Sequence, residues 1–279
     1  MKIIIAFFII ISLILLSIAT LTYMFFWYEF FNSSLNSSNK KCNFILILKS
    51  IIRSFFSLWF ILIIYPFNIF IPKYIKVNKT TYNKLPNIIL IHGLFHNKSA
   101  WIYILVKLIL SKKINAIYLI NYNSYLYSFK EILKQIENSI HSLTANKSNN
   151  QIILIGHSLG GLFCYALCQN QQISSQINCI ITLGTPYKGS KLAAFGISKL
   201  ARELRYKGEL VNEFKKANIA SHIKGFIFYS PIDNLVLPNS SLKSPISKWQ
   251  EIITAPVNHV AMLYNTDIAN KIIKIITNC

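Results

Sequence analysis

The sequence predicts an α/β protein, in which a mostly parallel sheet is flanked by helices and preceded by apolar helices near the N-terminus. The first observation behind this prediction is that, after Pro86, short apolar runs of strand length alternate with longer amphipathic segments. The second is that 53% of the 279 residues are apolar, which is above the usual share for a globular domain. The excess lies in the first third of the chain, in two long apolar stretches.

The elements of the sheet domain follow from these patterns. Strands are expected at 88–91, 116–121, 152–155, 179–183, 223–229 and 251–254, and helices at 99–110, 129–143, directly after Ser158, and at 268–276. In parallel sheets of this kind, ligands bind beyond the carboxyl ends of the strands. Functional residues are therefore expected in the loops that follow the strands.

The first third of the chain predicts attachment to a membrane. We expect a membrane-anchoring region over 1–84 and a catalytic domain over 85–279. A helix over 3–28 is uncharged and long enough to cross a bilayer core; the alternative is a cleavable signal peptide, because Ser17-Ile18-Ala19 offers small residues at cleavage-like spacing. A second helix over 54–72 crosses the bilayer, lies in its interface, or covers the apolar mouth of the catalytic domain. Lysine and arginine counts do not decide on which side the catalytic domain lies.

Charge and cysteine content narrow the function classes. The net charge of +20 suits anionic lipid surfaces or nucleic acid; no nucleic-acid-binding module is present, so lipid is favoured, with a general compositional preference for Lys, Asn and Ile as the alternative. Five cysteines without C-x-x-C spacing argue against a disulfide framework and a zinc site. Acidic residues are too few for a calcium cage. We expect no cofactor and no metal.

The segment from Gln151 to Leu167 is typical of a nucleophile elbow. An apolar run leads into Gly156-His157-Ser158-Leu159-Gly160, and a stretch with helical spacing follows at once. The turn between such a strand and helix is strained and closely packed, which requires glycine on both sides of the serine. Ser158 is therefore the candidate nucleophile. The alternative is a serine that caps an ordinary strand-to-helix turn.

A second motif lies at the end of the predicted strand 88–91, where His92-Gly93-Leu94-Phe95 follows. The glycine allows the next backbone amide, that of Leu94, to turn toward the site. Together with the amide of Leu159, it would form a two-donor oxyanion hole. His92 and His157 are expected to hold their loops by hydrogen bonds rather than to act as bases.

A serine nucleophile needs a histidine base, and the base needs an acid. Of the two histidines after Ser158, His222 opens a predicted strand, whereas His259 lies in a loop after the last predicted strand. The chain holds only two aspartates. Asp267 is explained as a charge near the start of the closing helix, and Asp233 follows a strand end. We therefore expect a triad of Ser158, Asp233 and His259.

These motifs together resemble the bacterial triacylglycerol lipase and esterase branch of the α/β-hydrolases. The resemblance covers 85–279 and is carried by the HG pair at 92–93, GHSLGG at 156–161, LGTPYKGSKLA at 183–193, SPIDNLVLPNSS at 230–241 and NHVAML at 258–263. It implies the α/β-hydrolase fold, a Ser158–Asp233–His259 triad, and Leu94 and Leu159 as oxyanion donors. One departure is Asn258, where such proteins more often have glycine. Because asparagine tolerates left-handed backbone, we expect little effect.

The expected function is a membrane-associated serine hydrolase that cleaves carboxylic esters of lipids through an acyl-enzyme. The alternatives are a thioesterase or acyltransferase with the same triad, or a catalytically silent hydrolase-fold interaction protein. The expected partners are a lipid or ester substrate and the membrane, and not nucleic acid; the oligomeric state is left open. The basic segment over 188–220 is either a lid or an ordinary surface helix, and Gly184-Thr185-Pro186 either shapes the acyl pocket or only forms a tight turn.

Overall fold

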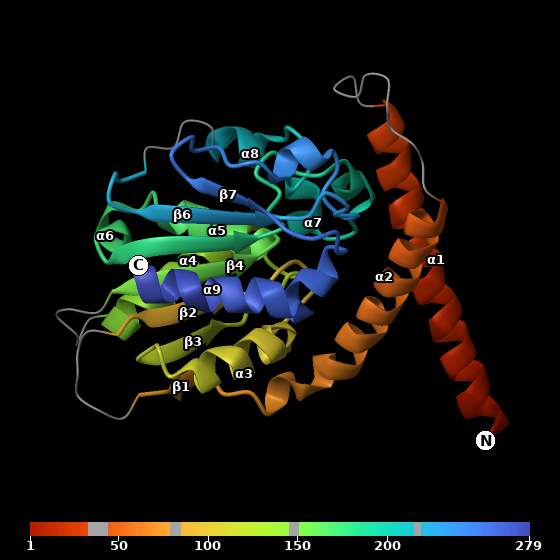
Figure 1. Ribbon diagram of the computed structural model, residues 1–279, viewed down its shortest axis with the longest axis horizontal. Coiled ribbons are helices and arrows are strands. Elements are labelled where there is room, and N and C mark those ends of the chain that lie inside the picture. Colours follow the sequence, from red (N-terminus) through yellow and green to blue (C-terminus); the bar gives the residue numbers. More distant parts are fainter. Residues whose placement is uncertain (33–43, 79–84, 145–150, 215–218) are drawn as a thin grey trace.

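A seven-stranded sheet in the order β1-β3-β2-β4-β5-β6-β7 forms the centre of the computed structural model, which describes residues 1–32, 44–78, 85–144, 151–214 and 219–279. The strands are β1 (Tyr74–Lys76), β2 (Asn87–Ile91), β3 (Ala116–Ile120), β4 (Ile152–His157), β5 (Ile177–Leu183), β6 (Lys224–Tyr229) and β7 (Gln250–Ile253). All are parallel except β1, which pairs antiparallel with β3. This is the α/β-hydrolase fold that the sequence predicted (Figure 1).

Helices cover both faces of the sheet, and each face has its own apolar core (Figure 1). On one face lie α4 (Phe129–Thr144) and α5 (Leu159–Leu167), and on the other α3 (Ile102–Ser111) and α9 (Thr266–Asn278). Shorter helices and 3-10 turns connect the layers: η2 (Lys98–Trp101), α6 (Gln171–Ser174), η3 (Lys191–Phe195), α7 (Lys199–Glu203), α8 (Glu209–Glu213), η5 (Asn239–Leu242) and η6 (Val260–Tyr264). Every predicted strand and helix of the sheet domain is present, with ends shifted by a few residues.

Strand β1 was not predicted. It has three residues, lies at the edge of the sheet and contains no apolar run, so it lacks the pattern by which a buried strand is found. The sheet therefore begins at Tyr74, inside the region 1–84 that the sequence separated from the catalytic domain.

Two long apolar helices precede the sheet, α1 (Lys2–Asn32) and α2 (Phe44–Ile64), and the 3-10 turn η1 (Tyr65–Ile69) follows α2. Helix α1 contains the predicted helix 3–28, but α2 differs from the predicted 54–72. It begins earlier because Lys49 and Arg53 expose their charges to the outside of the helix. It ends earlier because Pro66 has no backbone N–H to continue the helix.

Both helices have the length and apolarity of membrane spans, over Lys2–Asn32 and Ile45–Ile69. A signal sequence near the N-terminus meets the same criterion as the first of them. The two helices pack side by side, with the rings of Phe8 and Trp59 6.1 Å apart. In Figure 1 α1 stands beside the sheet domain and its first half projects away from it.

The second half of α1 packs on the sheet domain through a small apolar cluster, which we call the docking cluster. It consists of Tyr23, Phe26 and Trp27 of α1 together with Ile232 and Leu237 of the loop after β6. Helix α2 reaches the loop after β7, where the Phe60 and Tyr264 rings meet at 4.6 Å. Both apolar helices thus contact segments that follow the carboxyl ends of the strands.

Candidate active site

Ser158 lies at a strained turn between β4 and α5. Its backbone has φ 55° and ψ −123°, a conformation that L-residues rarely adopt outside functional sites. The flanking glycines allow close packing: a Cβ on Gly160 would lie 2.0 Å from the Ile91 carbonyl oxygen, and one on Gly156 2.5 Å from the backbone of Gly160. The local geometry is therefore that of a nucleophile elbow.

Asp233 and His259 lie in the loops after β6 and β7 and meet through a short hydrogen bond. His259 Nδ1 is 2.7 Å from Asp233 Oδ2, and both side chains are buried. The other carboxylate oxygen, Oδ1, accepts hydrogen bonds from the backbone amides of Leu235 and Val236, each at 3.0 Å. These bonds fix the orientation of the carboxylate, which favours the tautomer with the proton on Nδ1 of His259 and leaves Nε2 able to accept one.

A cavity of about 300 Å³ brings Ser158, His259 and Leu94 together. Within the described residues, the Ser158 hydroxyl makes no hydrogen bond to His259; in unliganded hydrolases such a bond often tightens only when substrate binds. Gly93 approaches the nucleophile closely, because a Cβ on it would lie 3.0 Å from Ser158 Cβ. The loop after β2 thus forms one wall of the site.

The two predicted oxyanion donors flank this wall. Leu94 lines the cavity, and Leu159 is the first residue of α5, directly after Ser158. In the part of the chain that the structure describes, neither backbone amide donates a hydrogen bond. Amides left free beside a nucleophile are available to a developing oxyanion, and the start of α5 adds a favourable helix dipole.

Three further histidines surround the pair and remain uncharged near neutral pH. Burial lowers the pKa of His92 to about 4 and that of His96 to about 3, and it lowers the pKa of His157 well below the ordinary 6.5. His92 contacts the Gly93 carbonyl through Nδ1 and accepts from the Tyr122 amide through Nε2, and His157 Nε2 contacts the His259 carbonyl. His92 and His157 thus hold loops, as the sequence indicated.

These buried histidines predict a loss of stability in mild acid. Their pKa values are lower in the folded than in the unfolded chain, so below pH 6.5 the unfolded state binds more protons, and stability falls as the pH decreases toward 5. Each histidine contributes a slope of up to about 1.4 kcal/mol per pH unit. Thermal melts of detergent-solubilised protein between pH 8 and pH 5 measure this slope.

The matched variants for this prediction are His92→Asn and His222→Asn. His222 is exposed and contacts the Ser174 carbonyl, so it serves as an exposed control, and His92→Asn should reduce the slope more than His222→Asn does. Equal melting temperatures at pH 7 and pH 5 in the wild type would contradict the prediction.

The segment over 188–220 forms several short helices rather than one amphipathic helix. Leu200 and Leu204 pack into the core on the α4–α5 side, while Ile197 is exposed. Leu192 and Phe195 line the cavity of Ser158. The segment is therefore both packed on the domain and part of the cavity wall; residues 215–218 lie outside the described residues.

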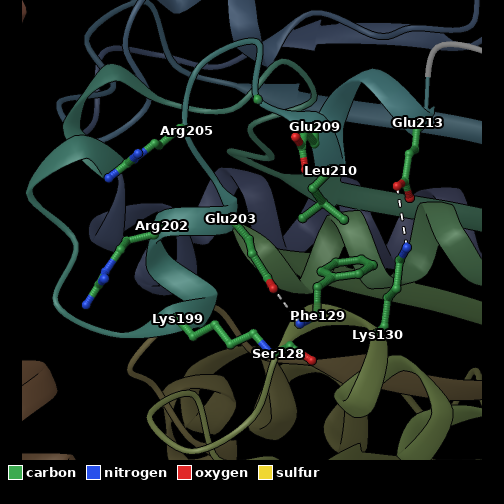
Figure 2. Close-up of a pocket in the computed structure, with 11 residues that line it drawn as sticks. Ser128, Phe129, Lys130, Lys199, Arg202, Glu203, Arg205, Glu209, Leu210 and Glu213 are labelled. Carbon is green, nitrogen blue, oxygen red and sulfur yellow. Dashed lines mark hydrogen bonds and ion pairs between the residues drawn. The ribbon is translucent and has the colours of Figure 1, made fainter.

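A second, larger cavity of about 720 Å³ lies between the start of α4 and helices α7 and α8 (Figure 2). Glu203 accepts a hydrogen bond from the Phe129 amide at 2.8 Å, and Lys130 pairs with Glu213 at 3.4 Å. The side chains of Arg202 and Arg205 extend away from Phe129 in Figure 2. None of the predicted site residues lines this cavity, so we assign it no part in the chemistry.

The structure also places the other aspartate and the cysteines that the sequence singled out. Asp267 is in the first turn of α9 and pairs with Lys271 at 2.8 Å. Cys164 and Cys168 are buried at α5, where burial raises the pKa of both thiols; Cys42 lies outside the described residues. Sequence reasoning assigned no role to Asn234 and none to the Asn258 side chain, although each is a buried amide beside a proposed catalytic residue.

A match over more than half of the chain shows its family. Residues 109–276 match the family model described as a PGAP1-like alpha/beta domain, and this range is more than half of the chain. The chain belongs to the PGAP1-like α/β domain family. The matched range contains Ser158, Asp233 and His259 but begins after Leu94 and after both apolar helices.

Two curated relatives of this PGAP1-like chain are yeast proteins. It is 37% identical over 73 residues to a GPI inositol-deacylase of Candida albicans, covering 24% of this chain and 19% of the relative. It is 24% identical over 136 residues to triacylglycerol lipase 2 of Saccharomyces cerevisiae, covering 44% of this chain and 38% of the relative. The matches thus span less than two fifths of either relative. They do not confirm the bacterial branch that the motifs resembled.

A solved structure shows the same fold. The mature lipase BlEst2 of Bacillus licheniformis has a TM-score of 0.58 and 14% identity, over 73% of this chain and 98% of that chain. At this identity the likeness concerns the fold alone. The PGAP1-like chain has the α/β-hydrolase fold.

Proposed function

We propose that this protein is a membrane-anchored serine hydrolase that removes acyl groups from lipid-borne carboxylic esters. Ser158 is the nucleophile, His259 the base and Asp233 the acid. The observation that carries the proposal is the 2.7 Å bond from Asp233 Oδ2 to Nδ1 of His259, which lines the same cavity as Ser158. Supporting it are the strained elbow at Ser158 and the match to the PGAP1-like family.

The reaction follows from these positions. Ser158 Oγ attacks the ester carbonyl carbon while His259 Nε2 takes the hydroxyl proton, and Asp233 stabilises the imidazolium. The oxyanion accepts hydrogen bonds from the amides of Leu94 and Leu159. The tetrahedral intermediate then expels the alcohol, which receives the proton from His259. Water, activated by the same base, releases the carboxylic acid and restores Ser158.

The substrate class rests on the cavity and on the names of the relatives. Apolar side chains of Leu192, Leu204 and Val236 line the cavity beside Ser158, which suits an acyl chain. One relative is named for removing an acyl group from the inositol of a glycolipid and the other for cleaving triacylglycerols; both names describe the cleavage of an oxygen ester on a lipid. We propose α1 and α2 as the membrane anchor that brings the site to such lipids.

A fluorophosphonate probe tests the nucleophile directly. The full chain in detergent is labelled, and the modified residue is located by mass spectrometry. We expect the label on Ser158. Ser190 is the matched internal control, because it lines the same cavity but its hydroxyl donates to the Leu235 carbonyl at 2.7 Å. Folded protein that carries no label at Ser158 would contradict the proposal.

Substrate preference is measured on the same preparation. Initial rates on p-nitrophenyl esters of increasing chain length separate an esterase from a lipase, and a thioester substrate or an alcohol acceptor reveals the related acyl transfers. Release of fatty acid from an acylated inositol phospholipid, compared with a triacylglycerol, then distinguishes the two kinds of substrate that the relatives' names suggest. The apolar cavity predicts higher kcat/KM for longer acyl chains.

A further inference from the structure

The loops that carry Asp233 and His259 are each tied to one of the apolar helices by a buried asparagine. Asn234 follows the acid and Asn258 precedes the base, and both side chains are almost fully buried. A buried amide needs partners for its oxygen and its nitrogen. In both cases the oxygen binds the catalytic loop and the nitrogen binds a hydroxyl on an apolar helix.

On the acid side, Asn234 joins α1 to the backbone of the base. Its Oδ1 accepts from the His259 amide at 3.2 Å, and its Nδ2 donates to Thr22 Oγ1 at 2.8 Å. The Thr22 hydroxyl donates to the Ala19 carbonyl of its own helix at 3.1 Å, so toward Asn234 it can only accept. The Asn234 amide therefore has one orientation, in which its oxygen faces the His259 N–H.

On the base side, Asn258 repeats the same arrangement with α2. Its Oδ1 accepts from the Ala261 amide at 2.8 Å, and its Nδ2 donates to Ser57 Oγ at 3.1 Å. The Ser57 hydroxyl donates to the Arg53 carbonyl at 2.8 Å. The backbone of Asn258 is not left-handed, so the side-chain clamp, rather than backbone freedom, is the structural role of this asparagine.

Two more contacts hold α1 on the sheet domain, one at the loop that carries Asp233 and one at η3. Tyr23, fully buried in the docking cluster, donates to the Ile232 carbonyl at 3.3 Å, one residue before Asp233. Glu29 near the end of α1 pairs with Lys191 at 2.8 Å. Helix α1 thus contacts the residues directly before and after Asp233, and α2 contacts the residue directly before His259.

We propose that Thr22 and Ser57 are positioning residues for the His259 base, so that these two positions of the apolar helices support catalysis in addition to the proposed anchoring. The inference rests on the proposed triad. Its physical basis is that His259 must hold Nε2 within hydrogen-bonding reach of Ser158, and a small displacement of a base costs rate without affecting substrate binding.

The test compares kcat and KM of detergent-solubilised full-length variants on one p-nitrophenyl ester. Thr22→Val and Ser57→Ala remove the hydroxyls at little change in volume, and Thr22→Ser and Ser57→Thr keep them. Ser17→Ala is the matched control, because Ser17 also donates to its own helix, at 2.8 Å to the Leu13 carbonyl, and is not buried. Thermal melts report whether each variant is folded.

We expect kcat to fall between about threefold and tenfold in Thr22→Val and in Ser57→Ala, as for the loss of one neutral hydrogen bond, with KM unchanged. The hydroxyl-retaining variants should recover the wild-type kcat. Fluorophosphonate labelling of Ser158 should slow in parallel.

The inference is overturned if Thr22→Val and Ser57→Ala retain the wild-type kcat, if Ser17→Ala loses as much, or if the hydroxyl-retaining variants fail to recover it while folded. It is also overturned if activity falls only in proportion to the folded fraction. A wild type that neither hydrolyses esters nor labels at Ser158 refutes the proposed function instead, and this control is read before any variant is compared.

Discussion

Ser158→Ala is expected to abolish ester hydrolysis while leaving the protein folded. Removing the nucleophile of a serine triad costs on the order of a 10⁶-fold loss in kcat, because the remaining groups cannot replace the covalent step. The fold should persist, because within the described residues the Ser158 hydroxyl bonds neither Asp233 nor His259, whose own contact stays intact. Initial rates on a p-nitrophenyl ester, with melting curves on the same samples, check both statements.

Two outcomes would contradict this prediction. Equal ester hydrolysis by the wild type and by folded Ser158→Ala would mean that the activity comes from another site or from a contaminant. Absence of activity in both, together with absence of fluorophosphonate labelling, would favour a hydrolase fold that serves as an interaction domain.

Asp233→Asn is expected to lower kcat by on the order of 10⁴-fold. The reason is the fixed orientation of the side chain. Oδ1 of Asp233 accepts hydrogen bonds from two backbone amides. In the asparagine variant the side-chain oxygen must therefore occupy this position, and the new NH₂ group must face His259. That NH₂ group donates a hydrogen bond to Nδ1 of His259, so the ring proton must lie on Nε2. A protonated Nε2 can no longer accept the proton of Ser158.

The second aspartate of the chain is the matched control for this substitution. Asp267→Asn removes the same charge from an exposed position that, among the described residues, forms an ion pair with Lys271 one turn along α9, so kcat should not change. Melting curves separate a tautomer effect from unfolding, because Asp233→Asn keeps the size of the side chain and its two backbone bonds. A folded Asp233→Asn protein with wild-type kcat would remove Asp233 from the proposed triad.

The positions of the proposed catalytic residues were accessible from the sequence because they depend on local rules. A strained serine between glycines specifies an elbow, and the loops after successive parallel strands must meet at one edge of the sheet. With only two aspartates and two histidines to consider after Ser158, this topology selects Asp233 and His259. The structure brings them within 2.7 Å of each other.

The strand patterns were equally local. Runs such as those of β2 and β4 are buried on both faces, so they consist of consecutive apolar residues that can be recognised in the sequence. Strand β1 lacks this property because it is a three-residue edge strand. Its pairing with β3 depends on a neighbour far along the chain, which no local pattern records.

The sequence by itself determined the fold class, the elbow at Ser158 and the apolar character of the first third of the chain. Only the tertiary structure decided where α1 and α2 pack, and with it the contacts on which the proposed roles of Thr22, Ser57, Asn234 and Asn258 rest. The Asn258 contact to Ser57 joins residues 201 positions apart. Such contacts depend on the packing of whole helices against loops, and an isolated threonine or asparagine carries no periodicity from which its partner can be predicted.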